Sequence, residues 1–229
     1  MVPFNEPLEG SVPFLYLDQL GLVTTAIGVL VDPIGMVYGL PLKDPDTGLQ
    51  ASANDIALDW SRVKLRQDLK MRGGMAYKNI ARLRLDKSGV EQVTFRKLDT
   101  MLRSLRSRFP EWDTWPADAQ LGVVSLAWAC GPAFRFPKLA RHLSERDWAS
   151  AEGEISIAND HGTIKKRNAW MKLCMRNAAA VEAAGADPDV LHWPNEAPKF
   201  STDPPIGGGM LAIEGVVDAT LEARKSQLD

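Results

Sequence analysis

Two carboxyl groups and two hydroxyl groups lie close together near the start of the chain, in the stretch LEGSVPFLYLDQLGLVTTAIG. Glu9 stands directly before Gly10, Asp18 follows an apolar run, and Thr24 and Thr25 come shortly after it. The run between the two acids, SVPFLYL, is too apolar to be a solvated loop. We therefore expect an ordered frame that holds these polar groups at fixed positions.

Two carboxyl groups beside a cleft can hydrolyse a glycosidic bond. One must be protonated, so that it can give its proton to the glycosidic oxygen. The other stays ionised, to orient water or to stabilise positive charge on the sugar. A carboxyl group in an apolar setting keeps its proton more readily than one in water. Glu9, between Leu8 and an apolar run, is the candidate acid, and Asp18 is the candidate charged partner.

The elements that would position these residues begin with a small β lobe. Residues 1–50 are punctuated by Pro and Gly. Their short apolar runs, LVTTAIGVLV and GMVYGL, predict a β-hairpin region. DPDTG, residues 44–48, predicts a plain turn rather than a calcium loop, because Gly falls one position early and no Glu closes the loop.

Helical patterns follow and predict a larger helical lobe. Ser52 begins a helix that is expected to reach about Met71, and a second helix with Leu98 and Met101 on one face is expected to stop at Pro110. Residues 117–130 are apolar almost all round, which predicts a central helix buried on every side. Two short helices and a long one that ends before Gly185 complete the lobe. The expected fold class is α+β, mainly α.

The expected domain boundary lies at residue 185. Residues 186–209 hold five prolines and the run GGG, which predicts an extended segment. Residues 210–225 predict one last helix. We therefore expect one catalytic domain, 1–185, and a Pro- and Gly-rich extension, 186–229.

The N-terminal stretch resembles the catalytic segment of phage-type lysozymes, the muramidases that serve phages as endolysins. That family carries Glu-Gly near its N-terminus, then an aromatic-x-Asp, then a Gly and a Thr that lead into a hairpin. The matching residues, at matching intervals, are Glu9-Gly10, Tyr16-x-Asp18, Gly21 and Thr24. The resemblance implies a lysozyme-like fold, with Glu9 as the general acid and with Asp18 and Thr24 placing the attacking water.

The resemblance continues to about residue 184. VVSLAWACGPAF is similar to the buried central helix of the family, and FPKLARHLSERDW is similar to the segment that follows it. In GTIKKRNAW, Arg167 stands where the family has an Arg that pairs with the catalytic Glu. The chain departs from the family in three places: the hairpin lacks the usual first Gly and the His, Ala129 replaces an Asn, and Pro13 precedes Asp18. These departures imply a divergent member.

Each of these residues also has a structural interpretation. Glu9 could be an acid in the first turn of a helix, and Asp18 could cap a turn. Thr24 could act only as a β-former, and Arg167 could be a surface arginine. Trp128, a candidate for substrate binding, fits a core position better than a sugar platform.

The composition is typical of a soluble globular protein. Of 229 residues, 45% are hydrophobic and 24% are charged, and no stretch reaches the ~18 apolar residues of a membrane span. The start, MVPFNEPLEG, lacks the pattern of a signal peptide, so synthesis in the cytoplasm is expected. Cys130 and Cys174 are expected to be buried free thiols. The three histidines form no metal motif, and no metal or cofactor is expected.

Charge is distributed unevenly along the chain. Residues 1–60 contain eight acids and one lysine, a net charge of −7, and residues 61–108 contain fourteen cations and four acids, a net of +10. Such a basic segment is usually the solvated face of helices, or else a surface for a polyanion, either nucleic acid or an anionic cell-wall polymer. No groove-reading motif accompanies it, so nucleic acid is the weaker alternative.

The expected function is a peptidoglycan hydrolase that cuts the β-1,4 bond between N-acetylmuramic acid and N-acetylglucosamine. It would act in the periplasm or cell wall as a monomer, after release through a holin or delivery by a secretion system. A secreted toxin of this kind would have a cognate immunity protein. The alternative from another class is a glycan-binding or phage structural protein that has lost catalysis.

Overall fold

The computed structural model describes residues 2–158 and 162–198. They belong to the first of two compact units, Met1–Lys199 and Phe200–Asp229. The chain is mainly helical, with 56% helix and 8% strand, which confirms the expected α+β class. The helix expected over residues 210–225 lies outside the described residues.

Three short strands form an antiparallel sheet in the order β1 (Val12–Leu17), β2 (Val23–Ala26) and β3 (Val29–Leu30). The hairpin predicted over LVTTAIGVLV is thus confirmed as β2 and β3. GMVYGL, in contrast, is not a strand. Its first two residues belong to the 3₁₀ helix η1 (Ile34–Met36), because the amide of Met36 donates to Pro33 O, 2.9 Å away, in a local turn rather than in a ladder.

Two helices flank this sheet along the chain, α1 (Val2–Glu9) before it and α2 (Ala53–Lys64) after it. Ser52 begins α2 as expected, since its hydroxyl accepts the amide of Asp55 at 3.2 Å. The helix ends at Lys64 and does not reach Met71.

The early end of α2 has a tertiary cause. The Gln67 side chain turns back and donates to the carbonyls of Lys64 and Gly21, at 3.1 and 3.2 Å, while the Tyr77 hydroxyl donates to Arg66 O at 2.8 Å. These bonds fold the chain into two 3₁₀ helices, η2 (Gln67–Arg72) and η3 (Gly74–Tyr77).

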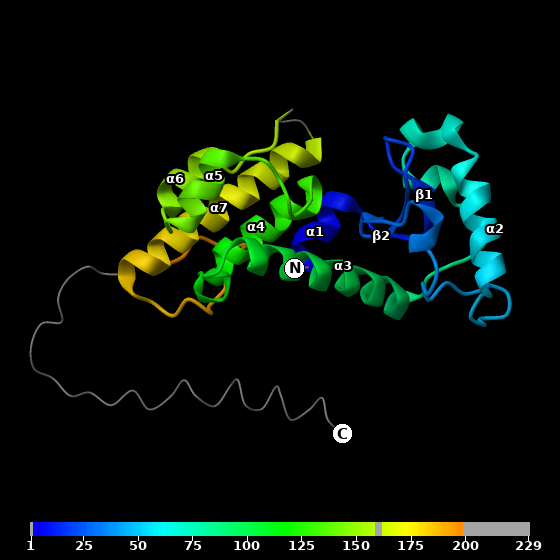
Figure 1. Cartoon of the computed structure of the whole chain (residues 1–229), viewed down its shortest axis with the longest axis horizontal. Coiled ribbons are helices and arrows are strands. Elements are labelled where there is room, and N and C mark those ends of the chain that lie inside the picture. Colours follow the sequence, from blue (N-terminus) through cyan, green and yellow to red (C-terminus); the bar gives the residue numbers. More distant parts are fainter. Residues whose placement is uncertain (1, 159–161, 199–229) are drawn as a thin grey trace, which may run out of the picture. The chain divides into compact units, whose positions relative to one another are not determined.

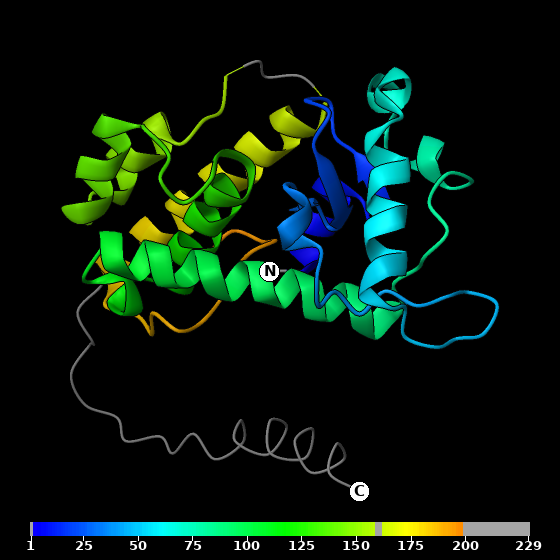
Figure 2. The ribbon, with the colours of Figure 1, turned by 45° about the vertical axis from the view of Figure 1, so that its right-hand side comes forward.

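A long helix, α3 (Lys87–Arg108), links the two lobes of this unit. In Figures 1 and 2 it runs from the sheet-bearing lobe to the helical lobe. It stops two residues before Pro110, as the sequence predicts.

The helical lobe is built around α4 (Ala117–Cys130), which has the predicted bounds and buries ten of its residues. The 3₁₀ helix η4 (Trp112–Thr114) precedes it, and α5 (Pro137–Ser144), α6 (Trp148–Glu154) and α7 (Gly162–Ala184) follow. Figure 1 shows α7 crossing close to α4. A Cβ atom at Gly122 would lie 2.9 Å from Met175 Cε and 3.0 Å from Cys174 Cβ, so only glycine allows these two helices to pack this closely.

Residues 186–198 pack onto the helical lobe, so the boundary predicted at residue 185 is too early. The carboxylate of Asp118, fully buried in α4, accepts the amides of His192 and Trp193 at 2.8 and 3.0 Å. The Trp193 ring lies 4.8 Å from Phe4 and 5.2 Å from Trp170, centroid to centroid. These contacts attach the Pro-rich segment to the core, and the compact unit ends at Lys199.

Both cysteines are free, and Cys174 is buried as expected. The prediction is wrong for Cys130, which is exposed. It is the last residue of α4, at the point where the chain turns away at Gly131 with a φ of +81°.

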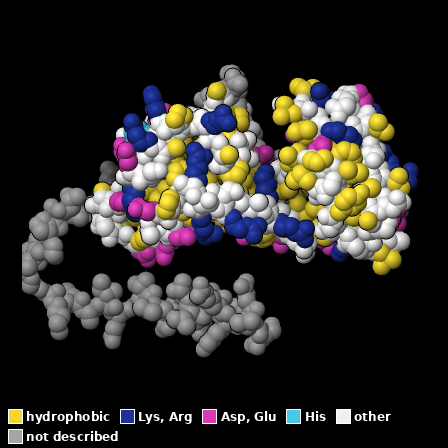
Figure 3. Space-filling model, in the orientation of Figure 1, with side chains coloured by type: hydrophobic (Ala, Val, Ile, Leu, Met, Phe, Trp, Pro, Cys, Tyr) yellow, Lys and Arg dark blue, Asp and Glu magenta, His cyan; other side chains and the backbone are white. Residues whose placement is uncertain are grey.

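The surface carries apolar and basic regions in different places. Figure 3 shows hydrophobic side chains gathered on the sheet-bearing lobe and Lys and Arg side chains along α3. Within residues 2–158 and 162–198, no helix combines the length and the apolar character needed to cross a membrane.

Candidate active site

Glu9 is the last residue of α1 and lies at the junction of the two lobes. Gly10 follows with a φ of +73° and donates its amide to Glu6 O at 2.9 Å, which ends the helix and turns the chain into β1. The alternative of a first-turn acid is therefore wrong, since the negative end of the helix dipole is at Glu9. Its side chain is 26% exposed, enough to reach a ligand.

Arg167 of α7 forms an ion pair with Glu9, the pairing that the family resemblance implies. Its side chain is only 3% exposed, so it is not a surface arginine. Its Nη1 donates to the carbonyl and the hydroxyl of Ser125, each at 2.9 Å, and to Asn5 Oδ1 at 3.3 Å. Burial lowers the pKa of Arg167, and the charge of Glu9 opposes this shift. Three helices therefore hold one planar cation against the Glu9 carboxylate.

The turn between β2 and β3 covers the other side of the Glu9 carboxylate. Gly28 has a φ of +64°, and a Cβ atom there would lie 3.0 Å from Glu9 Oε2. No side chain fits at this position without displacing the carboxylate. Because Gly28 has no side chain, the backbone of the turn can lie directly against the carboxylate of the candidate acid.

Lys97 of α3 and Trp128 of α4 hold this turn. Lys97 Nζ donates to Gly28 O at 2.7 Å and lies 4.0 Å from the centroid of the Trp128 ring. The Trp128 indole donates to Ile27 O at 3.1 Å. Burial lowers the pKa of Lys97 to about 8, with Arg167 adding to the shift and Glu9 opposing it. Trp128 is buried, in agreement with its interpretation as a core residue.

Sequence reasoning did not single out Lys97, although a signal was present. It lies four residues after Val93 and four before Met101, both buried, so helical spacing places a lysine in the buried stripe of α3.

Asp18 and Thr24 lie on the sheet, and both are engaged with the backbone. Asp18 Oδ1 accepts the amides of Leu20 and Leu22, each at 2.9 Å, so Asp18 does cap the β1–β2 turn. Thr24 is buried and donates its hydroxyl proton to Leu22 O at 3.2 Å. In the described part of the chain, neither residue has a direct bond to Glu9.

Tyr16 is the residue that relates the two carboxylates. It lies opposite Thr24 in the sheet. Burial raises the pKa of Tyr16, and the charges of Glu9 and Asp18 raise it further. Both carboxylates therefore act on this phenol, although Asp18 and Glu9 do not touch. In the sequence analysis, Tyr16 appears only as the aromatic residue of the Tyr16-x-Asp18 motif.

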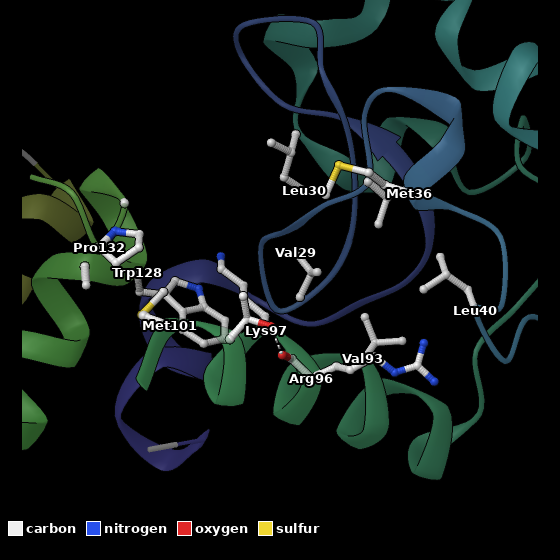
Figure 4. Close-up of a pocket in the computed structure, with 14 residues that line it drawn as sticks. Val29, Leu30, Met36, Leu40, Val93, Arg96, Lys97, Met101, Trp128 and Pro132 are labelled. Atoms are coloured by element: carbon white, nitrogen blue, oxygen red, sulfur yellow. Dashed lines mark hydrogen bonds between the residues drawn. The ribbon is translucent and has the colours of Figure 1, made fainter. Parts of the chain in front are cut away.

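A groove of about 480 Å³ is lined by residues of both lobes, among them Val29 of the β2–β3 hairpin, Lys97 and Trp128. Figure 4 shows Leu30, Met36 and Leu40 on one side of it, Trp128 and Pro132 on the other, and Arg96 and Lys97 from α3 between them. Among the described residues, no Asp or Glu lines this groove. Its walls suit an apolar or anionic group, and two of its residues, Lys97 and Trp128, also bind the β2–β3 turn.

The basic segment is largely committed to intramolecular bonds. Arg62 pairs with Asp59 at 2.5 Å, Lys64 with Asp32 at 2.5 Å, and Arg84 and Arg108 donate to backbone carbonyls. Of its exposed cations, five have no ion pair within the described residues: Arg72, Lys78, Arg82, Lys87 and Arg96. The net charge of the segment therefore overstates the charge that is available to a ligand.

The site offers acid–base chemistry at one carboxyl group. The described residues contain no cluster of three or more His, Cys, Asp or Glu side chains that could hold a metal ion. No protein-family model matches the chain, and no curated protein matches it.

Proposed function

We propose that the protein is a muramidase, a glycoside hydrolase that cleaves the β-1,4 bond between N-acetylmuramic acid and N-acetylglucosamine in peptidoglycan. The observation that carries the proposal is the arrangement at Glu9. One partly exposed carboxyl group lies between a buried arginine and a bare glycine turn, at the junction of a small sheet and a helical lobe. A general acid must come within hydrogen-bond reach of the substrate oxygen, and the 26% exposure of the Glu9 side chain allows that approach.

The residues divide the reaction between them. Glu9 gives a proton to the glycosidic oxygen as the bond from that oxygen to the anomeric carbon breaks, and a water oxygen bonds to that carbon from the other face. Thr24 donates its own proton to Leu22 O, so its lone pairs remain to accept a hydrogen bond from the water. Asp18 uses Oδ1 for its turn, and Oδ2 accepts no hydrogen bond from the described residues. That second oxygen takes the proton that the water loses as its oxygen bonds to the anomeric carbon.

Purified peptidoglycan tests the proposal. Loss of turbidity, followed by mass analysis of the fragments, should give reducing sugar ends, which identify a hydrolase. Anhydro ends would instead identify a lytic transglycosylase. Release of fragments by wild type and not by Glu9→Gln assigns the chemistry to this carboxyl group.

A specific observation favours a second candidate function, a glycan-binding protein without catalysis. Asp18 caps its own turn, and the groove is lined mainly by apolar side chains. If the protein sediments with peptidoglycan but releases no fragments at any pH, the binding function replaces the catalytic one.

Action on the wall requires delivery across the inner membrane, through a holin-type pore or by a secretion system. Of these, we favour the secreted toxin, with an immunity protein as its partner. Expression in a bacterium tests the compartment: lysis should follow when an export signal is fused to the chain and not when the chain stays in the cytoplasm. Equal toxicity in both compartments would contradict a cell-wall target.

A further inference from the structure

We propose that Lys97 is the positioning residue that holds the Ile27–Gly28 turn against the Glu9 carboxylate, and that its ammonium form is the active one. The alkaline limb of the pH–activity profile then belongs to Lys97 and not to Glu9. This inference rests on the proposed function and adds to it the residue that controls the catalytic turn.

The geometry connects Lys97 to Glu9 through the turn. Lys97 Nζ donates to Gly28 O at 2.7 Å, and a Cβ atom at Gly28 would lie 3.0 Å from Glu9 Oε2. A shift of this turn by a few tenths of an ångström therefore alters the space beside the acid. Because Lys97 belongs to α3, which links the lobes, it also ties the sheet to the helical lobe at this point.

Loss of the proton weakens both contacts of the Lys97 side chain. A charged donor makes a stronger hydrogen bond to a carbonyl than a neutral amine does. The attraction to the Trp128 ring, 4.0 Å away, exists only for the cation. Deprotonation therefore leaves the turn held mainly by the bond from the Trp128 indole to Ile27 O.

The charges that face Lys97 help to determine the pH at which it loses its proton. Glu9 at the end of α1 attracts the ammonium, whereas Arg167 of α7 repels it. Arg96 lines the same groove from α3, and Cys130, at the end of α4, interacts with Arg167. The turn itself, residues 26–29, has no titratable side chain. With burial as the largest effect, the pKa of Lys97 falls to about 8.

The first experiment compares pH profiles of kcat and KM on a soluble peptidoglycan oligomer for wild type, Lys97→Met and Lys97→Arg. Wild type should lose activity with a midpoint near pH 8. Lys97→Met should lose about 10- to 100-fold in kcat at neutral pH, because the acid is misplaced, with KM little changed. It should also lack the midpoint near 8, and Lys97→Arg should move the limb to higher pH.

Lys87→Met is the matched control, since it makes the same change at an exposed position at the start of α3. It should keep the wild-type profile. A Lys97→Met variant with wild-type kcat and an unchanged alkaline limb would overturn the inference.

A second measurement needs no activity and separates this inference from the proposed function. The indole N–H resonance of Trp128, identified by its absence in Trp128→Phe, should shift with a midpoint near pH 8 in wild type. It should stay constant over that range in Lys97→Met. If wild type cleaves no glycan but the resonance titrates as described, the proposed function fails and the positioning role of Lys97 stands. A resonance that does not titrate in wild type would overturn the positioning role.

Discussion

At the scale of single residues, the pairing of Glu9 with Arg167 joins catalysis to stability. Glu9→Gln keeps the shape of the side chain and removes the transferable proton, so glycan cleavage should fall by about 10²- to 10⁴-fold. Gln still accepts a hydrogen bond from Arg167 but no longer balances its charge. Because Arg167 is almost fully buried, we expect a loss of about 1–3 kcal/mol in the free energy of unfolding.

Initial rates on peptidoglycan and urea unfolding of the same preparations measure the two effects. A gain in stability would mean that the cost of withdrawing the Glu9 carboxylate from water exceeds the benefit of its pairing with Arg167. Near-normal cleavage by Glu9→Gln would show that another group is the acid.

A second prediction at this scale concerns Lys97 and the pH dependence of the free energy of unfolding. Its pKa in the folded protein is about 8, below its ordinary value of 10.5. Between these values the unfolded chain binds more protons than the folded chain, so the free energy of unfolding should rise as pH increases from about 8 to 10.5. Below pH 8 both states are protonated, and the folded state bears the full cost of the buried charge.

Urea unfolding across pH 7–10 should show this rise in wild type and a smaller one in Lys97→Met. The variant should be the more stable protein at pH 7 and the less active one. A Lys97→Met variant whose stability rises with pH as steeply as that of wild type would contradict this assignment.

At the scale of elements, the β2–β3 turn leaves little space for a side chain at Gly28, because Glu9 lies against it. Gly28→Ala introduces a Cβ atom 3.0 Å from Glu9 Oε2 at a φ of +64°. We expect a loss of about 1–2 kcal/mol in the free energy of unfolding from the backbone strain alone. Cleavage should fall more than stability does, because the carboxylate must move.

Gly48→Ala is the matched control for this variant, since Gly48 also has a positive φ, +71°, and a Cβ atom there meets nothing within 4 Å. Thermal unfolding and cleavage rates measured on both variants separate strain at the site from loss of a glycine in general. Equal behaviour of the two variants would mean that the turn does not press on Glu9.

The elements also show where sequence reasoning succeeds and where it fails. α4 and α7 could be predicted to within a residue, because unbroken helical patterns end at Gly131 and Gly185. The end of α2 could not be predicted, since it depends on the bonds that Gln67 and Tyr77 make with distant backbone. The contact between the Gly28 turn and Glu9 could not be predicted either, because the two residues are far apart in the sequence and no local pattern indicates that they meet.

At the scale of the compact unit, residues 186–198 complete the helical lobe. A chain that ends at residue 185 loses the ring of Trp193 and leaves the buried carboxylate of Asp118 without the amides of His192 and Trp193. Of its hydrogen bonds to the described residues, only the one from Asn177, at 2.8 Å, remains. An uncompensated buried charge costs about 3–5 kcal/mol, so the 1–185 chain should unfold at a much lower temperature than the 1–199 chain.

Calorimetry of the two truncated proteins makes the comparison, with the full chain as reference. Equal melting temperatures for the 1–185 and 1–199 chains would restore residue 185 as the boundary. In that case the contacts of Trp193 would contribute nothing measurable to the fold.

The surface charge of the unit leads to a prediction about the wall. Three of the exposed cations without ion pairs in the described part of the basic segment, Arg72, Lys78 and Arg82, precede α3 and belong to the sheet-bearing lobe. Attraction between such charges and an anionic wall polymer is screened over ~8 Å at physiological salt. Binding to sacculi should therefore weaken as salt rises, while cleavage of a short soluble glycan should hardly change.

Replacing these three cations by Glu should act like added salt, whereas replacing Arg62 and Lys64 should destabilise the fold, because their partners Asp59 and Asp32 are largely buried. The measurement pairs sacculus digestion with soluble-oligomer cleavage across a salt series. Equal losses on both substrates would place the charges in the fold or the active site, and salt-sensitive binding to DNA without glycan cleavage would favour a nucleic-acid partner. A selective loss on sacculi would instead show that these cations retain the enzyme on its polymer, while the chemistry at Glu9 proceeds independently of them.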